Sequence, residues 1–337
     1  MIQISKSIPN SSGASKVSIV LGLAILAGLF LFPSFVQSPY ALHIMVLFFL
    51  STIQGEAWNL IGGYTGQYSV GHAAYFGAGA YTTMMLLQFK QIPPWYGMLA
   101  GIGVAVVVSL IIGSICFRLR GPYFVLASIA VAEIMRLSAM NLKDITNGAE
   151  GILATEIPPF KIGETLITDF ATKVPFYYIG LVIAILTILA TWLIQNSKLG
   201  YYFQAIREDQ DAARVLGIDP ARAKVTAYTI SAFFPALAGA IFFFKNGIIE
   251  PGPAFDLTRS IEALVMVMLG GYGTITGPIV GAVVYDRLRS YLITSPTFSN
   301  FHLFIAGALL LLIVLFVTAG VVGWLRQRVP SLRRYLE

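Results

Sequence analysis

The sequence contains only one cysteine, Cys116, and this residue lies inside an apolar run. A disulfide framework is therefore excluded, and we expect the thiol to be packed among apolar neighbours. Histidine is nearly as scarce, because His43, His72 and His302 are the only three and they are far apart. No His-Glu-x-x-His pattern occurs. The sequence gives no support to a metal centre or to a membrane metalloprotease.

Charged residues are also rare, at 11% of the chain, whereas 57% of the residues are hydrophobic and the mean hydropathy is +0.77. These values lie far outside those of soluble domains. They indicate an all-α polytopic membrane protein that is embedded in the lipid bilayer. The net charge of +6 is explained by basic cytoplasmic loops, so we expect no nucleic-acid partner. The phosphate-binding pattern G-x-x-x-x-G-K-[ST] is missing, and no catalytic constellation is apparent. We expect no enzyme and no cofactor bound by this chain.

Apolar runs long enough to cross a bilayer recur along the chain and predict a single transmembrane domain, 1–337, with about ten helices. The first run is long and lacks a small-x-small cleavage site, so we favour a retained span over a signal peptide. The eighth run is too short to cross as a plain helix. The predicted spans are 17–36, 41–61, 70–89, 96–117, 122–140, 175–195, 225–245, 260–271, 277–294 and 302–324.

The positive-inside rule predicts that both termini are cytoplasmic. This orientation also places segment 197–224 inside and the loop 141–174 in the periplasm. Two basic residues, Arg287 and Arg289, do not fit, which suggests that region 260–295 is broken or re-entrant. The basic residues that the orientation accounts for are Lys6, Lys16, Arg118, Arg120, Arg326, Arg328, Arg333 and Arg334.

Segment 197–224 gathers nine charged residues in a chain that has few. On a helical wheel, one half carries Phe203, Ala205, Ile206, Ala212, Ala213 and Leu216, and the other half carries Arg207, Glu208, Asp211 and Arg214. Asp209 falls on the apolar half and predicts a break between two short helices. Gly217 is placed to end the second helix, and Asp219-Pro220 to begin the next one.

The amphipathic segment is expected to contact a protein rather than lipid. Its polar half is mixed in sign and its apolar half is mostly alanine, whereas interfacial helices pair a basic face with bulky apolar residues. We therefore favour a helix presented to a cytoplasmic protein partner. A solvated loop helix without special function is the alternative.

Two glycine-rich stretches, residues 62–79 and 269–281, allow helices to approach closely. They also suit a discontinuous helix that lines a cavity. The ionisable residues Glu133 and Arg136 are three apart and are expected to pair. His72 is expected to bond across helices rather than to relay protons. The candidate pathway residues are Gly66, Gly71, His72, Tyr75, Glu262, Gly271 and Gly273.

The blocks AIREDQDAARVLGIDPARAKVTAYTISAFFPALAGAI and SIEALVMVMLGGYGTITGPIVGA resemble the LivM-type permease subunits of bacterial branched-chain amino acid ABC importers. Two earlier blocks, NLIGGYTGQYSVGHAAYFGAGAY and RLRGPYFVLASIAVAEIMR, look like the same family. Together these blocks cover most of residues 56–285. The run DAARVLGID is also similar to the coupling segment of vitamin B12 and siderophore permeases, which implies a type II importer fold.

The resemblance implies a permease of the bacterial inner membrane that imports branched-chain or other small hydrophobic or neutral amino acids. Its expected partners are ABC ATPase subunits that carry ATP and magnesium, a second, LivH-like permease subunit and a periplasmic substrate-binding protein. The residues expected to couple the chain to the ATPases are Ala205, Arg207, Glu208, Asp209, Ala212, Ala213, Leu216 and Gly217.

Two alternatives remain at the level of sequence. Residues 147–151, Asn-Gly-Ala-Glu-Gly, depart from the family pattern, and urea and short-chain amide permeases share nearly every block quoted above. A secondary transporter driven by an ion gradient would instead need membrane carboxylates such as Glu56, Glu133 or Glu262.

Overall fold

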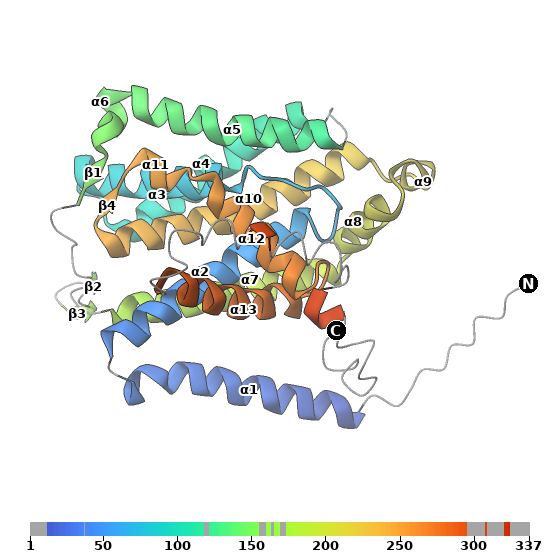
Figure 1. Cartoon of the computed structure of the whole chain (residues 1–337), viewed down its shortest axis with the longest axis horizontal. Coiled ribbons are helices and arrows are strands. Elements are labelled where there is room, and N and C mark those ends of the chain that lie inside the picture. Colours follow the sequence, from blue (N-terminus) through green and yellow to red (C-terminus); the bar gives the residue numbers. More distant parts are fainter. Residues whose placement is uncertain are drawn as a thin grey trace, which may run out of the picture.

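The computed structural model describes residues 12–36, 38–117, 121–154, 160–162, 165–168, 173–294, 307–308 and 320–323. Within these ranges the chain is a helical bundle with two small antiparallel sheets (Figure 1). The helices are α1 (Ser12–Phe35), α2 (Pro39–Ile61), α3 (His72–Lys90), α4 (Pro94–Cys116), α5 (Pro122–Asn141), α6 (Lys143–Thr146), η1 (Gly148–Glu150), α7 (Val174–Gln195), α8 (Lys198–Glu208), α9 (Gln210–Val215), α10 (Pro220–Asn246), α11 (Pro251–Ala254), α12 (Leu257–Gly270) and α13 (Thr276–Thr294). The strands are β1 (Ile152–Leu153), β2 (Phe160–Ile162), β3 (Thr165–Thr168) and β4 (Ile248–Ile249).

A helix occupies each of the first nine predicted spans, while most of the tenth, 302–324, lies outside the described residues. Several of these helices begin at a proline, whose fixed φ suits the first helical position. Within the described residues, five helices are long and apolar enough to cross a membrane: α2, α4, α5, α7 and α10. Helix α3 is less apolar, but most of its side chains are buried by neighbouring helices. The chain is therefore a multi-pass membrane protein.

Helix α10 lies at the centre of the bundle and packs against α3, α4 and α2. Small residues allow this close approach. A Cβ on Gly79 of α3 would collide with the backbone of Ala236 in α10, and a Cβ on Gly239 would collide with the backbone of Phe76. Apolar burial gives little drive between helices in lipid, so such packing geometry holds the bundle together.

The region around 260–295 is a broken element, as the misplaced arginines suggested. Helix α12 has 14 residues and is about 21 Å long, which is short of the roughly 30 Å of a hydrocarbon core. The chain then turns through residues 271–275 and continues as α13. Arg289 of α13 pairs with Glu262 of α12, with Nη2 3.3 Å from Oε1. This ion pair gives Arg289 a partner inside the hairpin.

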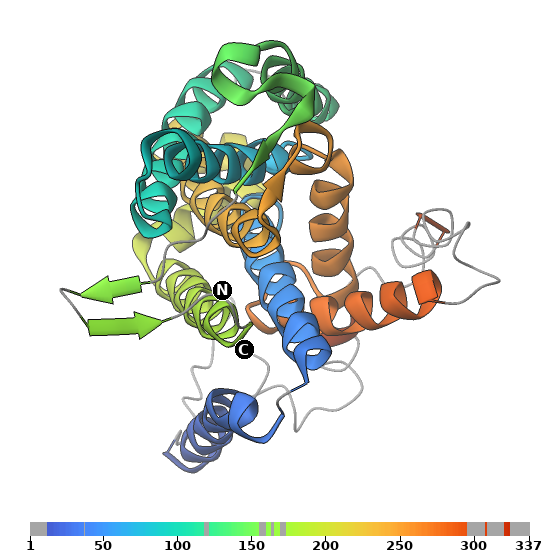
Figure 2. The same ribbon diagram turned by 90° about the vertical axis from the view of Figure 1, so that its left-hand side faces the viewer.

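The two ends of the bundle differ. Helices α8 and α9 project at one end, and α6, α11 and the β1–β4 sheet lie at the opposite end (Figure 1). Ile152 pairs with Ile249 in that sheet, and the hairpin of β2 and β3 extends sideways from the bundle (Figure 2). In the unusual stretch 147–151, Gly151 has a φ of +74°, and a Cβ there would collide with the carbonyl oxygen of Ile249. Glycine at this position is therefore required by the close approach of β4.

Candidate functional site

Helix α8 packs against the bundle through its apolar side chains. Phe203 and Ile206 are buried, and Ala213 of α9 is buried beside them. Lys224, at the start of α10, donates from Nζ to Oε1 of Gln210 at 2.7 Å and so ties α9 to α10. The two short helices are therefore held against the bundle by defined contacts and do not form a loose loop.

Asp209 makes the break between the two helices. Its backbone is extended, with φ −156° and ψ 115°, and it ends α8 and caps α9. Its Oδ1 accepts from the backbone amides of Asp211 at 2.8 Å and Ala212 at 2.9 Å. The predicted break is confirmed. So are the predicted ends, because Gly217 has a φ of +85° after α9, and Asp219 caps α10 ahead of Pro220.

Because of this break, part of the prediction from the helical wheel is wrong. Ala212 and Leu216, predicted on the apolar half, are both exposed, and Leu216 is 79% exposed. A single wheel assumes one continuous helix axis, whereas the extended backbone at Asp209 redirects α9. Val215, which the sequence prediction omitted, is 88% exposed. Two bulky apolar side chains therefore stand together at the tip of α9.

The projecting end combines this apolar tip with charge of both signs. Glu208 is exposed, and Asp211 and Arg214 are exposed on α9, where Nη1 of Arg214 lies 3.7 Å from Oδ1 of Asp211. Such a surface suits a protein partner, since an apolar centre with a polar rim is the usual composition of an interface. We name the exposed set Glu208, Asp211, Arg214, Val215 and Leu216 the α8–α9 tip.

The cap at Asp209 gives the first testable prediction. Hydrogen bonds from the amides of Ala212 and Asp211 lower the pKa of the Asp209 carboxyl below its ordinary value. The cap is therefore fully formed above pH about 4 and is lost only as the pH falls through the lowered pKa. At neutral pH, Asp209→Ala should speed hydrogen exchange at residues 211 and 212, while Asp209→Asn should not, because asparagine caps equally well. Equal exchange in both variants would contradict the cap.

The candidate pathway residues do not all lie together. Gly66, Gly271 and Gly273 lie in the turns after α2 and α12; Arg207 of α8 lies against Gly66 and Gly273. Gly71 lies elsewhere, against the backbone of Ser128 in α5. The structure therefore brings three of the glycines together at the α8 end of the bundle and not along one continuous line.

His72 and Tyr75 belong to a buried aromatic cluster. Nε2 of His72 lies 3.2 Å from Oγ of Ser231 in α10, which confirms the expected bond across helices. The ring of His72 lies 6.0 Å from that of Tyr75 and 6.1 Å from that of Tyr228, both edge-on. Because all of these side chains are buried, the cluster serves to join α3 to α10.

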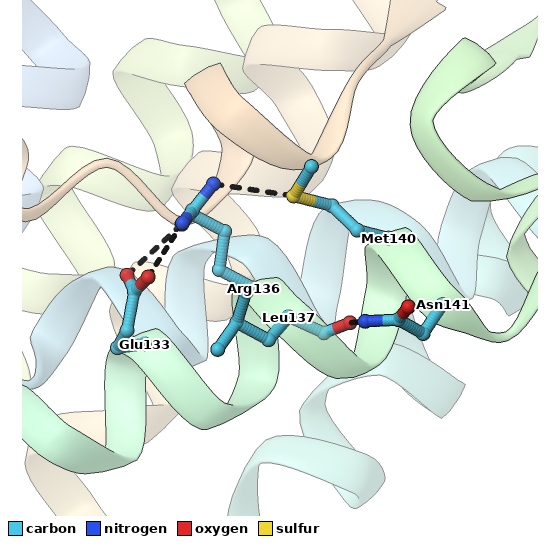
Figure 3. Close-up of polar contacts among 5 residues, drawn as sticks. All are labelled: Glu133, Arg136, Leu137, Met140 and Asn141. Atoms are coloured by element: carbon cyan, nitrogen blue, oxygen red, sulfur yellow. Dashed lines mark hydrogen bonds and ion pairs between the residues drawn. The ribbon is translucent and has the colours of Figure 1, made fainter.

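The membrane carboxylates lie on different helices. Glu133 and Arg136 form the predicted pair on α5, with Nε 2.9 Å from Oε2, and Nη1 of Arg136 also contacts Met140 (Figure 3). Glu262 is paired with Arg289 as described, and Glu56 is fully buried in α2. Two of the three carboxylates that an ion-driven mechanism would need are thus neutralised by arginine.

Asn59 is a second residue that the sequence prediction missed. Its Oδ1 accepts from the amide of Gly273 at 2.8 Å, and its Nδ2 donates to the carbonyl of Thr274 at 2.9 Å. The side chain thereby joins the end of α2 to the turn between α12 and α13. The sequence marks Asn59 only as a polar amide side chain near the end of the apolar run 41–61.

The sequence also matches a model of a known protein family. The model described as branched-chain amino acid transport system / permease component matches residues 40–314. The chain belongs to this permease family. It is similar to the high-affinity branched-chain amino acid transport system permease protein LivM of Salmonella typhimurium, with 28% identity over 87% of this chain and 72% of that protein. The LivM protein of Escherichia coli K12 is 27% identical with the same coverage.

Other permeases of the family match a smaller part of the chain. The fructose import permease protein FrcC of Rhizobium meliloti is 28% identical over 57% of this chain and 54% of its own length. The autoinducer 2 import system permease protein LsrC of Photorhabdus luminescens is 30% identical over 41% of this chain and 43% of its own length. No solved structure matches the chain. All four relatives are transport permeases, so nothing in the comparisons indicates a catalytic role.

Proposed function

We infer that this chain is a permease subunit of an ATP-driven ABC importer, and that it carries branched-chain or other small hydrophobic or neutral amino acids across the bacterial inner membrane. The observation that carries this proposal is the α8–α9 tip. This chain has few charged residues, and it builds here a capped, two-helix projection with exposed apolar and charged side chains. The family membership supports the same conclusion.

The tip supplies the contact through which separate ATPase subunits act. These subunits bind ATP and magnesium, and their closure moves α8 and α9 against the transmembrane helices. In this proposal segment 197–224 and both termini are cytoplasmic, residues 141–174 face the periplasm, and about ten spans form a single type II importer domain. A second, LivH-like permease subunit and a periplasmic substrate-binding protein complete the transporter.

The extent of the matches supports the proposed substrate class. The two LivM proteins match 87% of the chain, whereas the fructose and autoinducer permeases match 57% and 41%. We therefore propose an amino acid and not a sugar as the substrate. A periplasmic receptor sets much of the specificity in this arrangement, so the ligand bound by the receptor that works with this chain would decide between leucine, urea and fructose.

Reconstitution tests the proposal directly. The chain is placed in proteoliposomes with its second permease, its ATPases and its loaded receptor, and uptake of labelled leucine is measured. Uptake should require ATP on the ATPase side and should survive an uncoupler that dissipates ion gradients. Transport by the chain without any ATPase subunit would refute the proposal, and loss of uptake with the uncoupler at constant ATP would favour an ion-driven carrier.

Charge at the tip should control coupling. Reversing both Glu208 and Asp209 is a poor test, because it also removes the cap of α9. The variant Glu208→Lys with Asp209→Asn keeps the cap and reverses the exposed charge. Uptake should fall about 5-fold, as charge pairs at interfaces contribute to affinity and orientation, while membrane insertion stays unchanged.

The single variant Asp209→Asn is the matched control and should transport like the unmodified chain. Unchanged uptake by the double variant would show that charge at the tip does not contribute to coupling.

A further inference from the structure

Arg207 differs from the exposed charged residues of the α8–α9 tip because part of its side chain turns toward the bundle. Its side chain is 31% exposed, whereas that of its neighbour Glu208 is 76% exposed. Nη2 of Arg207 lies 3.2 Å from Oε1 of Glu208. The rest of the guanidinium is directed into the bundle, and its location there is not explained by contact with an ATPase subunit.

The inward contacts of Arg207 reach two turns that are far apart in the sequence. Nη1 donates to the carbonyl oxygen of Gly63 at 2.8 Å, directly after α2. The guanidinium carbon lies 5.8 Å from the ring centre of Tyr272, in the turn after α12. One side chain of α8 therefore contacts both the turn at 62–71 and the turn at 271–275.

Two glycines lie close to the arginine side chain. A Cβ on Gly66 would lie 3.1 Å from Cγ of Arg207, and a Cβ on Gly273 would lie 2.6 Å from its Nη1. Both glycines also have positive φ, at +69° and +71°, which other residues adopt only with strain. The two turns thus lie in close contact with this side chain.

The two turns are also joined to each other. Asn59, in the last turn of α2, bonds both the amide of Gly273 and the carbonyl of Thr274. Displacement of α8 would therefore act on the ends of α2 and α12 together. A guanidinium suits this position because its rigid fork can bond a carbonyl while its plane lies near an aromatic ring.

We propose that Arg207 is a positioning residue that transmits movement of α8 to the turns 62–71 and 271–275, and through them to α2 and α12. This inference rests on the proposed function, since it assumes that a partner moves α8. It assigns to Arg207 an inward role, in contrast to the outward-facing Glu208, Asp211 and Arg214. The physical basis is one bond, one ring contact and two glycine contacts in a contiguous network.

The test replaces Arg207 by methionine, which keeps an apolar stem and removes the donors and the charge. Hydrogen exchange is measured on the assembled transporter. Amides of the two turns should exchange about 10-fold faster in Arg207→Met, because a bond from a charged donor is lost there. Leucine imported per ATP hydrolysed should fall about 10-fold, while the ATPase subunits still co-purify with the chain.

Two further variants make the result specific. Arg214→Met removes an exposed arginine of the tip and should leave exchange in both turns unchanged. Arg207→Lys keeps the charge and one donor but lacks the planar fork, so it should recover part of the protection and part of the coupling. It also serves if the methionine variant fails to fold.

Several outcomes would overturn the inference. Unchanged exchange in both turns of Arg207→Met would do so, as would loss of the ATPase subunits from that variant, which would assign Arg207 to the docking surface. These results are distinct from failure of the proposed function, which would appear in the unmodified chain as uptake that needs no ATPase subunit.

Discussion

Replacement of Val215 and Leu216 together by aspartate is expected to abolish uptake and to release the ATPase subunits. The two side chains are 88% and 79% exposed at the tip of α9. In the proposed transporter this tip lies outside the bilayer, so a protein partner and not lipid must cover them. Apolar anchors at the centre of an interface carry most of its binding energy, and a buried unpaired carboxylate opposes binding strongly. Association should weaken by more than about 100-fold.

The measurement is co-purification of the ATPase subunits with the chain, followed by leucine uptake in proteoliposomes. The conservative variant Val215→Ile with Leu216→Met keeps an apolar tip and should retain both properties. Insertion into the membrane should be equal in both variants, because neither residue packs within the bundle. Retention of the ATPase subunits by the aspartate variant would show that the tip is not the docking surface.

Replacement of Gly101 by leucine is expected to destabilise the bundle. A Cβ on Gly101 of α4 would lie 2.8 Å from the carbonyl oxygen of Gly79 and 3.0 Å from its Cα, in α3. Backbone atoms cannot rotate away as a side chain can, so α4 must move away from α3. Overpacking of this kind costs about 3 kcal/mol. The apparent Tm should fall by roughly 4 °C, because the unfolding entropy of a chain of 337 residues is large.

Gly103, two residues further along α4, provides the matched control. A Cβ on Gly103 has no atom within 4 Å, so Gly103→Leu adds the same volume without a clash. Its Tm in detergent should stay within about 1 °C of the unmodified chain. Equal losses in both variants would mean that leucine is unfavourable along all of α4 and that contact with α3 is not the cause.

The helices could be predicted well from the sequence because their signals are local. Hydropathy runs predicted the first nine spans, and Asp219-Pro220 marked where α10 begins. The pairing of Glu133 with Arg136 was equally local, since residues three apart lie on one face of a helix. The short α12 and the turn after it were indicated by an apolar run too brief to span and by basic residues out of place.

The candidate site could be predicted only in part. The sequence marked the α8–α9 segment by its charge and marked the break at Asp209. It gave the wrong environment for Ala212 and Leu216, because a helical wheel cannot represent a change of axis between two helices. It also grouped Gly66 and Gly273 with His72 and Tyr75, although the first pair lies beside α8 and the second pair within the α3–α10 core.

The sequence by itself determined that this protein crosses the membrane many times, belongs to a permease family and carries one charged, helical projection. The spans and the projection follow from composition and from patterns within about 20 residues, and the family follows from a match over residues 40–314. Tertiary structure alone decided that Arg207 turns inward to Gly63, a contact between residues 144 positions apart. Such a contact depends on how the helices α2, α8 and α12 pack, and packing geometry leaves no periodic trace in the sequence.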